Sequence, residues 1–376
     1  MPPANPPDDA TPSPSPAAPV AVAASSAGRS WVGSLLSSPQ LGLLGVLVAL
    51  GVVLALTAGS HVDALSGKTV NNFLNEYTFL QMATDASGFA IMGVGATIVI
   101  IAGGIDLSVG AVYALSGVTM AMVLRAAGPM NPVATVALGL GTCLTVSFLC
   151  GLANGLMVIG LGVHSFIITL GTMWILRGLA FVASQAESIL VPSAVTNVAK
   201  ASLGMGEGLY PVPMLVMFVV TAIGAIYLSR TVMGRHIFAV GGNPEASRYA
   251  GLNVKRVTLG VFILSGLTAG IAAFLGASYY GSATSSDANG YELYVIASAV
   301  VGGASLLGGK GNAVSAMLGA MLIVLIRQAI RTLHLDQNYE WIIIGTTMIL
   351  AVVVDQSGTR LLERRLAAAN EKSKST

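Results

Sequence analysis

The chain has 376 residues, of which 54% are hydrophobic and only 9% are charged. Soluble globular domains carry roughly 25% charged residues, so this composition excludes an ordinary water-facing protein. A surface that meets lipid explains the deficit, because lipid penalises charge. The net charge of +2 leaves no strong field to attract nucleic acid. We therefore predict a protein that resides in the lipid bilayer and has no nucleic-acid partner.

The two ends of the chain differ in composition from the rest. Residues 1–30 are rich in Pro, Ala and Ser and cannot build a core, so we expect a disordered cytoplasmic tail. This stretch lacks a basic region followed by an apolar one, which argues against a cleaved signal peptide. Residues 357–376 form a basic tail, and we assign 39–356 to one transmembrane domain.

Apolar runs of about 20 residues, the length a helix needs to cross a bilayer, follow one another from Pro39 onward. The predicted fold is therefore all-α, a polytopic membrane protein of about ten transmembrane helices. We place them at residues 39–59, 79–101, 110–127, 133–157, 163–183, 211–229, 257–279, 291–307, 313–331 and 338–355.

The basic residues orient these helices. With ten spans, both termini lie on one side, together with the loop 230–256 and Lys310. That side then holds twelve of the 18 Lys and Arg residues, against five in the opposite loops and span ends. Basic residues are enriched on the cytoplasmic side of membrane proteins, so we predict cytoplasmic termini and an outer loop at 184–210.

A Gly-rich break, Gly103 to Gly110, separates the second and third predicted spans. Asp106 and Ser108 within it are good N-cap residues for the helix that follows. One interpretation is a tight turn at the cytoplasmic surface. The other is a broken helix or re-entrant loop that lines a polar path, since irregular backbone at membrane depth is tolerated only in such places.

A second Gly-rich break, residues 302–311, follows the eighth predicted span as the first break follows the second. Gly-interrupted segments at corresponding positions of two halves point to a transport path. Simple flexibility of a cytoplasmic turn is the alternative.

The loop 239–256 contains the start and stop signals of a short helix. Asn243 is a cap residue, Pro244 suits the first helical position, Glu245 lies in the first turn, and Gly251 is a stop. A helix this short is not stable alone, so it needs a partner surface, which a cytoplasmic protein would supply. An amphipathic connector that rests on the membrane is the alternative.

Several classes of protein lack support. The chain has no GxxxxGK segment followed by Ser or Thr, so it cannot itself drive transport with ATP. We find no nucleophile–base pair and no metal-ligand cluster, so we expect neither an enzyme nor a metal site; Cys143 and Cys150 are interpreted as packing residues. An ion-coupled secondary transporter would need paired carboxylates inside the membrane. We count Asp106 alone, so this class has little support.

Four segments together resemble one family: GGIDLSVGAVYALSG, NGLMVIGLGVHSFIITLGTMWILRGLA, GRHIFAVGGNPEASRYAGLNV and GYELYVIASAVVGGASLLGGKGNAVSAMLGA. They look like the permeases of the ribose, xylose and arabinose type of ABC importers, and the similarity runs from about residue 40 to 356. One departure is His164, at a position where that family frequently has proline.

The resemblance implies a permease subunit in the bacterial inner membrane that forms the path for a sugar or sugar-like solute, such as a pentose, hexose or cyclitol. A nucleoside or a furanosyl signalling compound is the alternative solute. The implied partners are a second copy of the chain, a cytoplasmic ATPase with two nucleotide-binding domains, and a periplasmic sugar-binding protein. ATP and Mg would be used by that ATPase, and this chain would bind no cofactor.

The resemblance also places the contact with the ATPase in the segment 239–256. We assign coupling to five of its residues, namely Gly242, Asn243, Glu245, Arg248 and Gly251. An uncharged sugar needs groups that match hydroxyls, and polar residues inside the spans supply them. The candidates for the path are Asp106, Ser108, Asn154, Thr169, Thr172 and Arg177. Asn154 and Arg177 are costly in lipid, so they face a helix interface or the path, or Arg177 snorkels outward.

Overall fold

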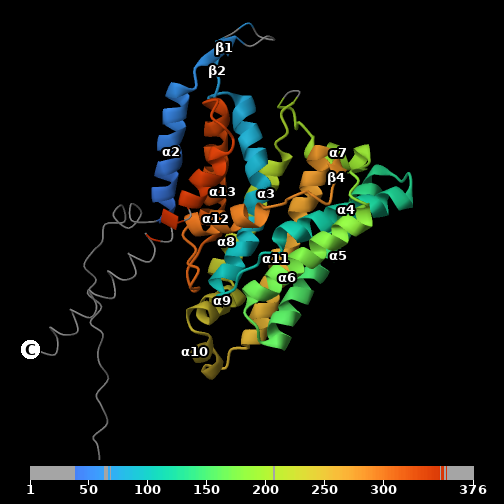
Figure 1. The fold of residues 1–376 in the computed structure, drawn as a ribbon, viewed down its shortest axis with the longest axis vertical. Coiled ribbons are helices and arrows are strands. Elements are labelled where there is room, and N and C mark those ends of the chain that lie inside the picture. The colour runs from blue at the N-terminus through green and yellow to red at the C-terminus, as the bar shows by residue number, and fades with distance from the viewer. Residues whose placement is uncertain are drawn as a thin grey trace, which may run out of the picture. The chain divides into compact units, whose positions relative to one another are not determined.

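The computed structural model describes residues 39–62, 67, 69–205, 208–347, 349, 350 and 353. The predicted tails, 1–30 and 357–376, lie outside these residues. Figure 1 shows that the described part consists of helices joined by short connections, with only two small pairs of strands. The all-α prediction is confirmed.

Eight of the described helices are long and apolar enough to cross a membrane. They are α2 (Pro39–Thr57), α3 (Glu76–Ile101), α4 (Val109–Ala127), α5 (Pro132–Leu161), α6 (Ser165–Ser184), α8 (Val212–Arg230), α11 (Val254–Tyr280) and α13 (Ala313–Thr332). Four shorter helices are α7 (Ser193–Ala199), α9 (Val232–Gly242), α10 (Pro244–Tyr249) and α12 (Tyr291–Val301). Strand β1 (Ser60–Val62) pairs antiparallel with β2 (Thr69–Asn71), and β3 (Ile189–Leu190) pairs antiparallel with β4 (Ser282–Ala283).

The predicted eighth span, 291–307, is wrong in length. Helix α12 ends at Val301 after 11 residues, and Gly302 and Gly303 follow. Eleven residues reach roughly 16 Å, well short of the ~30 Å hydrocarbon core. The glycines stop the helix, and the backbone then turns back toward α13. Of the tenth predicted span, 338–355, the described residues are helical from Tyr339, and the others lie outside the described part.

Asparagine caps start many of the helices. In each case the side-chain oxygen accepts a hydrogen bond from a backbone N–H of the first turn, which satisfies a donor that has no partner within the helix. These caps are Asn75, Asn131, Asn243, Asn253 and Asn312. His164 does the same for α6, because its Nδ1 accepts from the N–H of Phe166 at 3.3 Å. The departure from proline at this position thus has a capping role.

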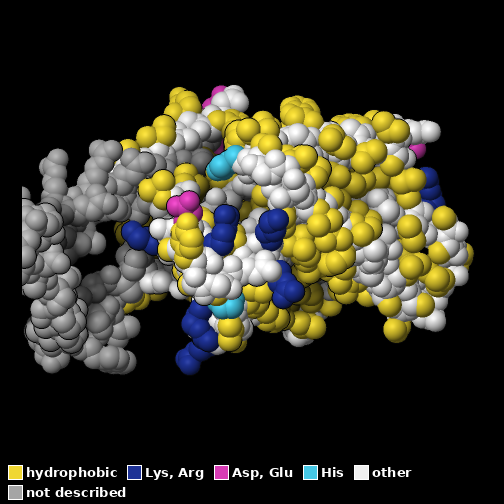
Figure 2. Space-filling model, turned by 90° about the horizontal axis from the view of Figure 1, so that it is seen from below, with side chains coloured by type: hydrophobic (Ala, Val, Ile, Leu, Met, Phe, Trp, Pro, Cys, Tyr) yellow, Lys and Arg dark blue, Asp and Glu magenta, His cyan; other side chains and the backbone are white. Residues whose placement is uncertain are grey.

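The connections gather at two opposite ends of the long helices (Figure 1). We call them the α10 end, which holds α9 and α10, and the hairpin end, which holds β1, β2 and α7. Exposed basic residues gather at the α10 end, as Figure 2 shows from that side. They are Arg230, Arg235, Arg248, Lys255, Arg256 and Lys310. The basic residues that we assigned to the loop 230–256 and to Lys310 therefore share one end of the molecule.

Helix α3 forms the centre of the main hydrophobic core. Its residues Phe89, Ile91 and Met92 are fully buried in one cluster with side chains of α4, α11, α12 and α13. Helices α5 and α11 approach so closely that a Cβ added to Gly151 would lie 2.4 Å from the carbonyl oxygen of Phe262. Small residues allow such contacts between membrane helices. Close packing of this kind makes the hydrogen-bond partners of the buried polar groups informative.

Candidate functional site

A buried polar network surrounds Asp106, in the break between α3 and α4. The Asp106 side chain is 3% exposed. Its Oδ1 accepts hydrogen bonds from the N–H of Ser108 at 2.9 Å and from the Ser108 hydroxyl at 2.6 Å. Its Oδ2 accepts from the hydroxyl of Ser265, on α11, at 2.7 Å. Asn154, on α5, donates to the Ser108 hydroxyl at 2.8 Å. The network therefore ties the break to two other spans.

One polar atom of this network has no hydrogen-bond partner among the described residues. This atom is the buried Oδ1 of Asn154. A buried polar atom without a partner costs roughly 1–3 kcal/mol. Such an atom is retained where something else satisfies it, for example a water molecule or a passing solute.

Helix α6 holds the backbone of the same break. The N–H of Ile105 donates to the Ser165 hydroxyl at 2.9 Å, and the N–H of Leu107 donates to the Thr169 hydroxyl at 3.1 Å. The Thr169 hydroxyl in turn donates to the carbonyl of Ile105 at 3.1 Å. Side chains of α6 thus replace the hydrogen bonds that a helix would have made. The break begins at the exposed Gly103, but Asp106, Leu107 and Ser108 are buried among helices, which a turn confined to the surface does not explain.

Thr172 lies one turn further along α6. It is 7% exposed, and its hydroxyl donates to the carbonyl of Thr169 at 3.2 Å. Five of the six predicted path residues therefore lie on or beside one buried break, namely Asp106, Ser108, Asn154, Thr169 and Thr172. Arg177 is the sixth and has other partners.

Arg177 holds the loop that leads into α12. Its Nη1 donates to the carbonyls of Ser285 at 2.9 Å and Asp287 at 2.6 Å, and its Nη2 donates to the carbonyl of Ala288 at 3.2 Å. The side chain is 9% exposed. The proposed snorkelling of Arg177 into solvent is therefore wrong, and its guanidinium orders three backbone carbonyls instead.

The two Gly-rich breaks meet each other and the end of α9. The N–H of Gly309 donates to the carbonyl of Ile101 at 2.8 Å. A Cβ added to Gly241, on α9, would lie 1.6 Å from that same carbonyl oxygen and 2.8 Å from the nitrogen of Gly309. A Cβ added to Gly308 would lie 2.6 Å from the carbonyl oxygen of Gly241 and 3.1 Å from the Cα of Gly103. We call this contact of Gly103, Gly241, Gly308 and Gly309 the glycine junction.

The short helix predicted after Gly242 is confirmed as α10. The side chain of Asn243 accepts from the N–H of Ala246 at 2.9 Å, as expected of its cap. Gly251 has a φ of +82°, in the left-handed region that favours glycine after a helix. Glu245 and Arg248 are exposed, and neither forms an ion pair within the described part of the chain. Helix α10 therefore presents unpaired charges of both signs at the α10 end.

A second carboxylate within a predicted membrane span was not recognised from the sequence. Asp85 lies within α3, nine residues after the start of that span, so the count of Asp106 alone was wrong. Its carboxylate accepts from the Gln81 amide at 3.1 Å and forms an ion pair of 3.4 Å with Arg331 on α13. The hydroxyl of Tyr279 donates to Gln81 at 3.1 Å. The sequence feature that could have revealed this polar pair is the spacing of Gln81 and Asp85, which are four residues apart and therefore lie on one helix face.

A second ion pair involves Arg327, one helical turn before Arg331 on α13. The Nε of Arg327 is 2.9 Å from a carboxylate oxygen of Glu340, which also accepts from the Tyr294 hydroxyl at 2.8 Å. The Arg327 guanidinium lies 5.7 Å from the ring centre of Phe89 and 5.4 Å from that of Tyr294. Aromatic faces and a carboxylate thus stabilise this cation within the helical bundle.

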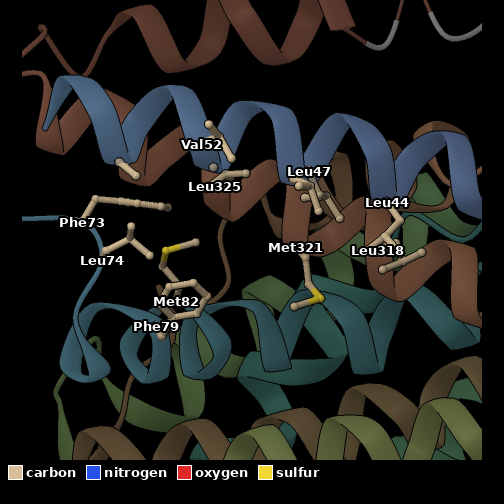
Figure 3. Close-up of a pocket in the computed structure, with 13 residues that line it drawn as sticks. Leu44, Leu47, Val52, Phe73, Leu74, Phe79, Met82, Leu318, Met321 and Leu325 are labelled. Carbon is tan, nitrogen blue, oxygen red and sulfur yellow. The ribbon is translucent and has the colours of Figure 1, made fainter.

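One cavity is excluded as a binding site for a polar solute. It measures about 370 Å³ and lies among α2, α3 and α13. The side chains that Figure 3 draws around it, among them Leu44, Phe79, Met321 and Leu325, contain no nitrogen and no oxygen. Such a lining cannot form hydrogen bonds with a solute that carries hydroxyl groups.

Known proteins match most of the chain. A family described as the branched-chain amino acid transport system permease component matches residues 78–352. The chain is 35% identical over 317 residues to the ribose import permease of Haemophilus influenzae, which covers 84% of this chain and 94% of the relative. It is 35% identical over 286 residues to the D-allose transport system permease of Escherichia coli, with 76% and 85% covered. It is 31% identical over 310 residues to the fructose import permease of Rhizobium meliloti, with 81% and 84% covered. No solved structure matches the chain.

Proposed function

Since the chain belongs to the family of branched-chain amino acid transport permease components, we propose that it is the permease subunit of an ATP-driven importer of a sugar or sugar-like solute. It is a multi-pass protein of the bacterial inner membrane. The observation that carries the choice of solute is the similarity to permeases named for ribose, D-allose and fructose along nearly their whole length. The family description names amino acids, so a branched-chain amino acid is the solute to test against.

The energy source in this proposal is a separate cytoplasmic ATPase with two nucleotide-binding domains, and α10 is the surface on which it docks. Three features support the docking. The α10 end carries six exposed basic residues, which supports a cytoplasmic position for it. Helix α10 has only six residues and needs a partner surface. Its Glu245 and Arg248 offer charges of both signs that have no ion-pair partner among the described residues.

The glycine junction connects α10 to the breaks in this mechanism. Helix α9 ends at Gly242, directly before α10, and the backbone of Gly241 packs against both Gly-rich breaks. A displacement of α10 by the ATPase therefore reaches the residues beside Asp106 through backbone contacts. The spans then rock between inward- and outward-open states, as in alternating access.

The inner part of the path in this proposal runs beside the Asp106 network. A sugar is uncharged, so it needs hydroxyl and amide groups rather than a strong field. Ser108, Thr169 and Asn154 supply such groups, and the unpaired Oδ1 of Asn154 is an acceptor for a sugar hydroxyl. The proposed complete importer has two copies of this chain and a periplasmic sugar-binding protein that delivers the solute.

The test is uptake by whole cells that express the chain with the ATPase and the periplasmic protein encoded beside it. Radiolabelled ribose, D-allose, fructose, adenosine and leucine are supplied separately. We expect accumulation of one of the sugars, and its loss when the phosphate-loop lysine of the ATPase is replaced by alanine.

Three outcomes would contradict the proposal. Accumulation of leucine alone would assign the chain to amino acids, and accumulation of adenosine alone would assign it to nucleosides. Sugar uptake that survives the ATPase variant but stops when a protonophore is added would show an ion-coupled transporter. In that last case the pairing of Asp85 with Arg331 would become the first place to look for the coupling ion.

A further inference from the structure

The second Gly-rich break folds into a compact turn at the α10 end. Within it the N–H of Gly308 donates to the carbonyl of Ser305 at 2.9 Å, and the N–H of Ser305 donates to the carbonyl of Lys310 at 3.1 Å. Gly308 and Gly309 have φ values of +86° and +72°, in the left-handed region that favours glycine. We call residues 305–310 the junction turn, because its two glycines belong to the glycine junction.

The junction turn exposes two neighbouring leucines. Leu306 is 41% exposed and Leu307 is 79% exposed, and Lys310 of the same turn is exposed as well. Figure 2 shows that hydrophobic side chains lie among the Lys and Arg side chains at this end of the molecule. Exposed apolar groups with a polar rim mark sites that bind another protein or a membrane.

The position of the junction turn favours a protein over the membrane. The N–H of Gly309 donates to the carbonyl of Ile101, the last residue of α3, at 2.8 Å. Among the eight long apolar helices, α3 is the most deeply buried. Lipid surrounds a membrane protein at its sides, so a turn fixed to the end of the central helix lies away from lipid. The exposed leucines of this turn therefore face the aqueous side.

The surface of the junction turn continues into that of α10. A Cβ added to Gly309 would lie 3.0 Å from the Cα of Gly242, the last residue of α9. Helix α10 starts two residues later, at Pro244, and its Tyr249 is 89% exposed. The end of α9 thus joins two exposed apolar groups, Leu307 through a backbone contact and Tyr249 through the chain.

We propose that the junction turn is a second docking site for the cytoplasmic ATPase, beside α10. Leu306 and Leu307 form the apolar centre of the contact, and Lys310 lies at its polar rim. The hydrogen bond from Gly309 to Ile101 then passes the movement of the ATPase to the end of α3, directly before the first Gly-rich break. This assignment rests on the proposed function, because it requires an ATPase partner.

A photoreactive side chain at position 307 tests the contact. Benzoylphenylalanine is incorporated in place of Leu307 in the complete importer, in inner-membrane vesicles, and the irradiated adduct is identified by mass spectrometry. We expect a covalent adduct with the ATPase chain. An adduct with lipid instead would place the turn at the membrane, and an adduct with a second copy of this chain would place it between permeases. Either result would overturn the second docking site.

The same probe in place of Tyr249 on α10 is the positive control. An ATPase adduct at 249 without one at 307 would overturn the second docking site and leave the proposed function intact. No ATPase adduct at either position, in an importer that accumulates sugar, would refute docking at α10 and at the turn together. Failure of the native importer to accumulate any sugar would instead refute the proposed function.

Leu307→Ser tests whether the contact contributes affinity. The substitution changes an exposed side chain, so the melting temperature should match that of the native chain. The affinity of the purified permease for the ATPase should fall at least about tenfold, the effect of one buried leucine. Leu190→Ser on β3, just before α7 and 78% exposed, is the matched control and should leave the affinity unchanged. Native affinity of Leu307→Ser would overturn the proposal.

Discussion

The backbone N–H of Gly309 donates a hydrogen bond of 2.8 Å to the carbonyl oxygen of Ile101, although the two residues lie in different breaks of the helical fold. Ile101 is the last residue of α3, where carbonyl groups have no partner within the helix. Gly309 therefore caps α3 from the other end of the chain. Gly241 packs against both groups, which makes this hydrogen bond the centre of the glycine junction.

Gly241→Ala should disrupt this junction. The added Cβ would lie 1.6 Å from the Ile101 oxygen and 2.8 Å from the Gly309 nitrogen, and both are backbone atoms that cannot rotate away. Overpacking of this kind costs typically about 1–3 kcal/mol. We expect a lower melting temperature of the detergent-solubilised protein and a loss of most uptake.

The control for this substitution is Gly260→Ala on α11, which adds the same methyl group to open space. Its melting temperature and uptake should match the native chain. If Gly241→Ala transported at the native rate, the close contact with Ile101 would be absent from the working protein.

Removal of the Asp106 carboxylate should destabilise the chain. Asp106→Ala leaves three donors without their acceptor, namely the N–H and hydroxyl of Ser108 and the hydroxyl of Ser265. Unsatisfied buried donors cost roughly 1–3 kcal/mol each, so we expect a total loss of about 3 kcal/mol or more. Asp106→Asn keeps an acceptor for Ser108 and offers Ser265 a donor, so it should cost about 1 kcal/mol.

The melting temperatures of the two Asp106 variants in detergent measure this difference. Asp106→Cys adds a test of depth, because a thiol in this buried break should react with a maleimide far more slowly than one placed in α10. Equal reaction rates from the cytoplasmic side, or equal stability of the Ala and Asn variants, would contradict the buried network.

Arg177→Lys should show that the guanidinium and not merely its charge is needed. The two terminal nitrogens donate to three carbonyls spread over Ser285, Asp287 and Ala288, which one ammonium group cannot reach together. A loss of about 2 kcal/mol should lower the melting temperature by a few degrees, about 2–5 °C. Arg125→Lys, at an exposed position in the last turn of α4, serves as the control and should leave the melting temperature unchanged.

The sequence predicted those parts of the fold that follow from local patterns. Hydrophobic runs located the long helices, and Asn243, Pro244 and Gly251 located α10 to within a residue or two. The break at 103–108 was recognised as well, but its backbone donates hydrogen bonds to Ser165 and Thr169, about 60 residues away. No local pattern reports such a contact.

Two errors have physical causes. The eighth span was drawn too long because residues 302–307 are small and apolar enough to continue a hydrophobic run, while the paired glycines that end α12 were read as part of a turn after it. Asp85 was overlooked because a single carboxylate does little to the mean hydropathy of a 26-residue helix. Its importance comes from Arg331, which lies 246 residues later and is brought close only by the packing of α13 on α3.

Reversal of charge on α10 should uncouple transport from ATP hydrolysis. Glu245→Lys and Arg248→Glu change exposed side chains that have no ion-pair partner in the described part of the chain, so the fold and the amount of protein in the membrane should stay the same. Like charges placed against the ATPase weaken docking, and we expect uptake to fall at least about tenfold, the effect of 1.4 kcal/mol. The control Arg230→Glu makes the same charge change as Arg248→Glu, at the α10 end but outside α10. This variant should transport normally. ATPase activity that still rises normally with the loaded binding protein in both α10 variants would show that the ATPase docks elsewhere.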